Sequence, residues 1–81
     1  MSGGYFNYKF FRIADFADEL KFEMMEDKNK FGEETRARLA FALASLKTAA
    51  ALAKEVEWFY SGDIGEDRFN SNVDEILDRY L

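Results

Sequence analysis

The stretch from Glu33 to Ser61 contains neither proline nor glycine, and this feature constrains the fold more than any other in the chain. It is rich in Ala, Leu, Lys, Arg and Glu, the residues with the highest helix propensity. A single helix of this length spans roughly 40 Å, since each residue adds about 1.5 Å. The shorter segments on either side are expected to pack against it.

Two apolar stripes run along this predicted helix. Helical periodicity places on the first stripe Leu39, Leu43, Leu46, Ala50 and Ala53, and on the second Phe41, Leu52 and Phe59. A helix that is apolar on two faces is buried on two faces. Two interpretations remain open: either both faces are covered within one chain, or one face packs against a second copy.

The rest of the chain predicts two shorter helices. The segment from Ile13 to Asp27 is amphipathic, and residues 69–81 carry a second apolar face. For the aromatic residues 5–11 a helix capped by Asn7 is favoured over a short strand. Short connections make consecutive helices antiparallel. We therefore expect an all-α fold, a small three-helix up-down-up bundle with a long central helix, in one domain over residues 1–81 whose residues 1–4 are disordered.

The absence of histidine and cysteine from the 81 residues limits the chemistry available. It removes the commonest nucleophiles, bases and metal ligands, so we expect no catalytic residue, no metal site and no cofactor. It also removes disulfides, and a chain this small buries only about 60% of its unfolded surface. Self-association is therefore the expected additional source of stability, in a homodimer or a higher oligomer.

Charge and hydropathy limit the partners and the compartment. Sixteen acidic residues against eleven basic ones give a net charge of −5, which argues against nucleic acid as a partner. The sequence shows no apolar run long enough to cross a bilayer, and its first residues lack the pattern of a signal peptide. A cytoplasmic protein with no membrane partner is expected.

The turn SGDIGED, from Ser61 to Asp67, supports two interpretations. In the structural one, which we favour, Gly62 ends the long helix in a left-handed conformation and Asp63 caps the next helix together with Glu66. In the functional one, the turn and the nearby aromatic side chains form a binding site. Its candidate residues are Tyr5, Phe6, Tyr8, Trp58, Ser61, Gly62, Asp63, Gly65, Glu66 and Asp67.

Two segments carry a resemblance to one family. The sequence GGYFNYK at residues 3–9 resembles a GG-aromatic-F-(D/N)-Y-K signature, and EWFYSGDIGEDRF at residues 57–69 is similar to a (D/E)W-x-x-SGD-x-GE-x-x-F segment. Both are features of a family of small proteins of bacteriophages and prophages. The chain departs from that family at residues 70–72, where Asn-Ser-Asn stands in place of basic residues or histidine. The resemblance implies expression in the cytoplasm of an infected bacterium.

The expected function is that of a non-catalytic phage-type accessory protein that acts as a protein-interaction module. By analogy with other small acidic phage proteins, its target is a host defence or replication protein. Two alternatives stay open. One is a sponge for a small, nucleotide-like anion, held by the aromatic N-terminus and the turn SGDIGED. The other is a purely structural homo-oligomer.

Overall fold

The computed structural model describes residues 4–26 and 30–80, and these residues form three helices. They are α1 (Phe10–Glu26), α2 (Glu33–Tyr60) and α3 (Glu66–Tyr80). The expected all-α fold with a long central helix is confirmed, and the described ranges contain no strand. Of the segment predicted to be disordered, residues 1–3 lie outside the described residues and Gly4 lies within them.

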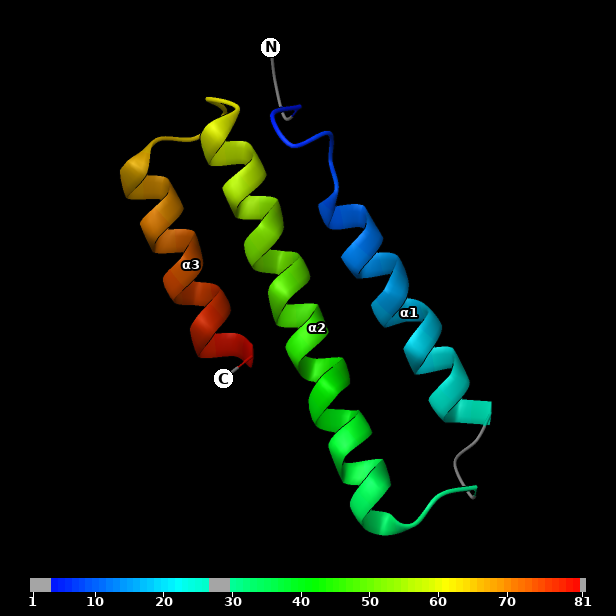
Figure 1. The fold of residues 1–81 in the computed structure, drawn as a ribbon. Helices are drawn as coiled ribbons and strands as arrows, with labels where there is room; N and C mark the ends of the chain where they lie inside the picture. The colour runs from blue at the N-terminus through cyan, green and yellow to red at the C-terminus, as the bar shows by residue number, and fades with distance from the viewer. Residues whose placement is uncertain (1–3, 27–29, 81) are drawn as a thin grey trace.

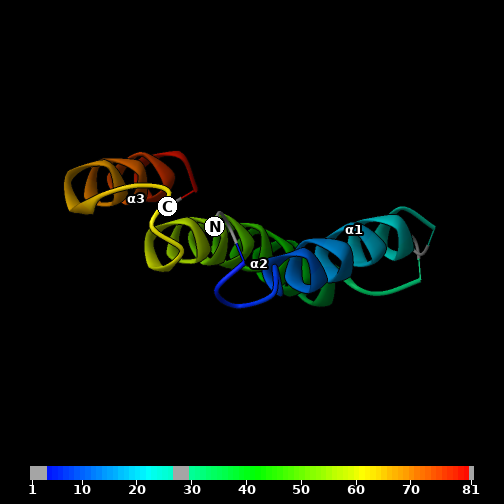
Figure 2. The ribbon, with the colours of Figure 1, turned by 90° about the horizontal axis from the view of Figure 1, so that it is seen from above.

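The three helices form a single layer rather than a closed bundle. Consecutive helices run in opposite directions, and α2 lies between α1 and α3 (Figures 1 and 2). The Cα atoms extend over 46 × 25 × 12 Å, so the molecule is much thinner in one direction than in the other two. Because α1 and α3 lie on opposite sides of α2, each packs against one helix only.

This layer leaves little of its apolar surface buried. In the part of the chain that is described, Ala17 and Ile76 are the buried apolar side chains. The accessible surface is 6190 Å², whereas a compact monomer of 9.4 kDa exposes about 5,000 Å². The radius of gyration is 15.2 Å, against about 12 Å for a compact domain of this length. A single copy is therefore flat and underpacked.

The N-terminal aromatic segment is not helical before Phe10, which corrects the expectation of a helix for residues 5–9. Helix α1 begins at Phe10, and residues 5–9 form turns. Asn7 and Tyr8 have positive φ angles of 57° and 56°, a left-handed conformation that a right-handed helix does not contain. Within the turn, the Asn7 N–H donates to the Gly4 carbonyl, and the Glu57 carboxylate of α2 accepts the Phe6 and Tyr8 N–H groups. The contact with α2 therefore overrides the helix propensity of the segment.

The two faces of α2 are covered to different extents. The leucine stripe packs along α1, while α3 covers the other stripe over only the half of α2 that ends at Tyr60 (Figure 1). With 15 residues against 28, α3 reaches about 22 Å along a helix of about 42 Å. Phe59 stacks on Phe69 at 4.9 Å between ring centroids, whereas Phe41 is 67% exposed. The interpretation in which one chain covers both faces of α2 is thus wrong for the N-terminal half of the second stripe, and the interpretation with a second copy stays open.

On α1 the predicted apolar face is only partly covered. Ala17 is buried against α2, and Ile13, Leu20 and Met24 are half-buried. Helical periodicity places Phe16 on the same face, but it is exposed, because it lies at the rim of the seam between α1 and α2 beside Leu46. Most of its ring therefore faces solvent.

A glycine lies at each end of α2. Gly32 caps the start of α2 in an extended conformation, as expected, with Glu33 and Glu34 in the first turn. Gly62 ends α2 with φ at +83°, and the Asp63 N–H donates to the Trp58 carbonyl at 2.9 Å. The Gly62 N–H donates to the Phe59 carbonyl at 3.1 Å, which completes a Schellman motif. The left-handed ending predicted for α2 is confirmed.

The capping box predicted at Asp63 is wrong. Helix α3 begins at Glu66, and the Gly65 carbonyl accepts the first helical hydrogen bond, from the Phe69 N–H at 2.9 Å. Gly65 is therefore the N-cap, and Asp63 lies two residues before it with an exposed side chain. This start accounts for a glycine at position 65, because glycine is tolerated at an N-cap.

Candidate binding site

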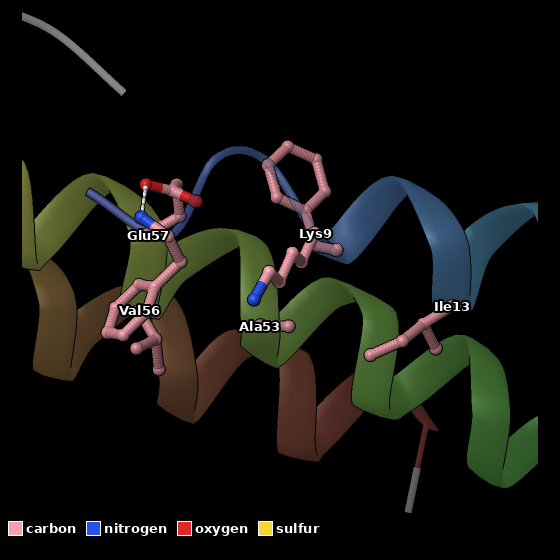
Figure 3. A pocket seen from close by; sticks show the side chains of 7 residues that line it. Lys9, Ile13, Ala53, Val56 and Glu57 are labelled. Atoms are coloured by element: carbon pink, nitrogen blue, oxygen red, sulfur yellow. Dashed lines mark hydrogen bonds between the residues drawn. The ribbon is translucent and has the colours of Figure 1, made fainter. Parts of the chain in front are cut away.

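A buried carboxylate joins the two ends of the sequence. Glu57 on α2 is 1% exposed, and its Oε2 accepts the Phe6 N–H at 2.7 Å. Its Oε1 accepts the Tyr8 N–H at 3.0 Å, and the Ser61 hydroxyl donates to Oε2 at 3.3 Å. Three donors aimed at one carboxylate compensate for its removal from water. Glu57 is thus the anchor that holds the N-terminal turn on α2 (Figure 3).

Ser61 extends this anchor to the next residue of the turn. Its hydroxyl oxygen accepts the Tyr5 N–H at 3.0 Å while its proton goes to Glu57. The aromatic rings of these residues pack around Tyr60. The centroid of the Tyr60 ring lies 5.3 Å from that of Tyr5, 5.5 Å from that of Phe6 and 5.6 Å from that of Phe59. The aromatic N-terminus and the end of α2 therefore form one unit.

The turn itself is strained. Asn tolerates a left-handed backbone, but Tyr8 carries a full side chain there, at a cost of about 1–2 kcal/mol. The strain persists because the two oxygens of the Glu57 carboxylate accept hydrogen bonds from the N–H groups of Phe6 and Tyr8. The conformation is therefore set by a tertiary contact and brings Lys9 and Phe10 over the face of α2.

Behind the turn lies an apolar pocket on the seam between α1 and α2. Its volume is about 370 Å³, within the range of small-molecule sites. It is lined by Phe6, Lys9, Phe10, Ile13, Ala53, Val56 and Glu57. Lys9 and Ile13 lie on the α1 side of the pocket, and the labelled residues of α2 form the opposite wall (Figure 3). Both Glu57 oxygens already accept hydrogen bonds, so the Lys9 ammonium is the charged group left to meet a ligand.

The candidate residues separate into two groups. Tyr5, Phe6, Tyr8 and Ser61 meet around Glu57, and Tyr5 and Ser61 also line a smaller hollow of about 180 Å³ with Gly4 and Tyr60. Trp58 is not part of this group. Its ring lies under the Lys54 ammonium at 4.7 Å, and it lines none of the described pockets.

The remaining candidates belong to the turn between α2 and α3. Their side chains or backbone are exposed, and the described structure does not bring them to the aromatic cluster. They are Gly62, Asp63, Gly65, Glu66 and Asp67. In the functional interpretation, SGDIGED and the aromatic N-terminus form one site. Of the turn residues, only Ser61 lies at that site.

Sequence reasoning missed Glu57 and Lys9 as site residues. A signal for Glu57 was present, because helical periodicity places this acid on the leucine stripe among Leu39, Leu46 and Ala50. A carboxylate on an apolar stripe needs donors, and the donors are backbone N–H groups that no side-chain pattern reveals. Lys9 carries no comparable signal.

A second buried acid links the other pair of helices. Glu55 is 8% exposed, and its Oε1 accepts the Asn72 amide of α3 at 2.8 Å. Asn72 thus fastens α3 to α2.

Over residues 4–26 and 30–80 no three acids, histidines or cysteines gather in a metal-binding arrangement. None of the helices among those residues is both long and apolar enough to span a bilayer. The chain matches no protein-family model, no curated protein and no solved structure.

Proposed function

We propose that the protein is a non-catalytic protein-interaction module that acts as a homo-oligomer. The observation that carries the proposal is the excess surface of one copy, 6190 Å² against about 5,000 Å² for a compact chain of this mass. The difference of about 1,200 Å² exceeds the roughly 800 Å² that each partner buries in a standard protein interface. Burial of an area of that size lowers the accessible surface of each copy to about that of a compact domain of the same mass.

The exposed side chains support the same function. Aromatic and methionine side chains are enriched in interfaces. Here they are exposed in the N-terminal turn, on α1 and on the N-terminal half of α2, and contact between copies needs only one of these surfaces. Those side chains with more than 55% exposure are Tyr5, Phe11, Phe16, Phe22, Met25 and Phe41. Where such side chains form a contiguous patch, the patch marks a protein–protein contact.

The resemblance to small phage proteins adds a bacterial host protein as the proposed second partner. The sequence supports a binding role over catalysis, because it contains neither histidine nor cysteine. A bacterial cytoplasm is the proposed compartment. The net charge of −5 favours a partner with a basic surface.

Co-expression of a tagged and an untagged copy tests self-association. Affinity purification should recover both copies in comparable amounts, and their ratio should persist through a wash at high salt, because the proposed contacts are apolar. A tagged unrelated helical protein of similar size serves as the control. Recovery of the tagged copy alone would contradict the proposal.

A second candidate function is capture of a small anionic ligand in the seam pocket. The observation that favours it is the combination of an apolar wall with one ammonium, from Lys9, over a volume of about 370 Å³. Extraction of the purified protein followed by mass spectrometry should then yield a bound anion. Lys9→Ala should lose that anion and Lys54→Ala, on the Trp58 side of α2, should keep it.

A further inference from the structure

The geometry points to a specific interface: the N-terminal half of α2 packs antiparallel against the same segment of a second copy, around a two-fold axis near Phe41. This inference rests on the proposed function and names the surface through which it operates. It starts from the face of α2 that α3 covers over only half its length.

One face of α2 runs through both the half that α3 covers and the half that it leaves uncovered. Helical periodicity places on it the residues Ala37, Phe41, Ala44, Thr48, Leu52, Glu55 and Phe59. The last four lie in the half that α3 covers: Thr48 and Glu55 are buried, Glu55 binds Asn72, and Phe59 stacks on Phe69. The same face is therefore an established helix–helix contact over half its length.

The other half of this face has no helix against it in the described structure. Phe41 is 67% exposed there, the most exposed aromatic side chain of the residues described, and Ala37 and Ala44 are exposed on either side. Small residues flanking one large residue form a self-complementary surface. In an antiparallel pair, Phe41 of each copy lies against the partner's small side chains, and position 37 lies opposite the partner's position 44.

A second copy fits this surface better than a small ligand or a charged partner. The exposed residues are Ala, Phe and Ala, with no charge at the centre, so apolar area is the available driving force. A partner helix on this half continues the contact that α3 makes on the other half of the same face. The excess surface of about 1,200 Å² belongs to the copy as a whole and exceeds the roughly 800 Å² that each partner buries in a standard interface. A two-fold axis also closes the assembly, so it produces a dimer and no fibre.

The first test compares Phe41→Glu with Phe22→Glu by sedimentation velocity. The two phenylalanines have similar exposure, 67% and 61%, but Phe22 lies on α1, away from the proposed axis. Phe41→Glu should weaken the dimer by about tenfold or more, as expected for a central interface aromatic, while Phe22→Glu leaves it unchanged. Helical circular dichroism should be the same in both variants.

Disulfide trapping gives a second test that does not depend on removing Phe41. The chain has no cysteine, so Ala37→Cys and Ala44→Cys each introduce a single thiol. A disulfide requires Cα atoms within about 7 Å, so the mixture of the two variants should cross-link faster than either variant alone. Faster cross-linking within each single variant would show a parallel pair and overturn the proposed geometry.

The outcomes separate this interface from the proposed function. A wild-type protein that is monomeric overturns both. A wild-type dimer that survives Phe41→Glu and does not cross-link between positions 37 and 44 overturns the interface only. Dissociation by Phe22→Glu in place of Phe41→Glu would assign the contact to α1.

Discussion

The Phe6 N–H lies 2.7 Å from Oε2 of Glu57, a residue 51 positions later in the chain. This hydrogen bond and its companion from Tyr8 fix the N-terminal turn on the end of α2, where it completes one wall of the seam pocket. Since each hydrogen bond to a charged group is worth about 1.5–3 kcal/mol, the pair is a large part of the stability of an 81-residue chain.

Replacement of Glu57 by alanine should therefore destabilise the protein by about 3 kcal/mol, because two backbone donors lose their acceptor. For a domain of this size that lowers the melting temperature by more than about 10 °C. Glu23→Ala, an exposed acid on α1, is the matched control and should change it little. Equal melting temperatures for the two variants would show that the Glu57 anchor is not a stabilising contact.

The left-handed turn predicts opposite effects for two substitutions at Asn7. Asn7→Gly should keep or raise the melting temperature, because glycine adopts a φ of 57° without strain. Asn7→Val should lower it by several degrees, because a β-branched residue is an outlier in that region. Thermal denaturation of the two variants side by side checks the sign, and the reverse order would contradict the conformation of the turn.

The two glycines of the turn after α2 should also respond differently. Gly62→Ala should cost about 1 kcal/mol because its φ is +83°, although nothing lies within 4 Å of an added Cβ. Gly65→Ser should be neutral or stabilising by a few tenths of a kcal/mol, since serine caps a helix at least as well as glycine. Asp63→Ala should stay within about 0.5 kcal/mol of the native protein, because Asp63 is not the N-cap. A loss of about 1 kcal/mol in the free energy of unfolding of Asp63→Ala would show that Asp63 does cap α3.

The attachment of α3 should depend on Asn72. Asn72→Ala leaves the buried Glu55 carboxylate without its amide donor, which should cost about 1–3 kcal/mol. Asn70→Ala, two residues earlier and exposed, should change the free energy of unfolding by less than about 0.5 kcal/mol. Urea denaturation of the two variants measures the difference. An equal effect would mean that apolar packing alone holds α3 in place.

Local patterns in the sequence predict the long helix α2 and both of its ends. The absence of glycine and proline from residues 33–60 predicts α2, and Gly62 predicts its left-handed ending because only local backbone sterics are involved. The i, i+4 pair of Glu34 and Arg38, at 2.9 Å, follows from the same local spacing. At 78–80% exposure this ion pair adds little to stability.

Long-range contacts account for what the sequence did not predict. The turn at Asn7 and Tyr8 depends on a carboxylate about 50 residues away, so local propensity favours a helix that does not form. The exposure of Phe41 depends on the length of α3 and on the half of α2 that it covers. Periodicity identifies an apolar stripe but does not say where along its length a partner ends.

The mass of the wild-type protein in solution, measured by light scattering over a range of concentrations, tests self-association most directly. The excess surface of one copy predicts at tens of micromolar a mass that is a whole multiple, two or greater, of 9.4 kDa. It also predicts a radius of gyration larger than the 15.2 Å of one copy. A mass of 9.4 kDa at every concentration would contradict it.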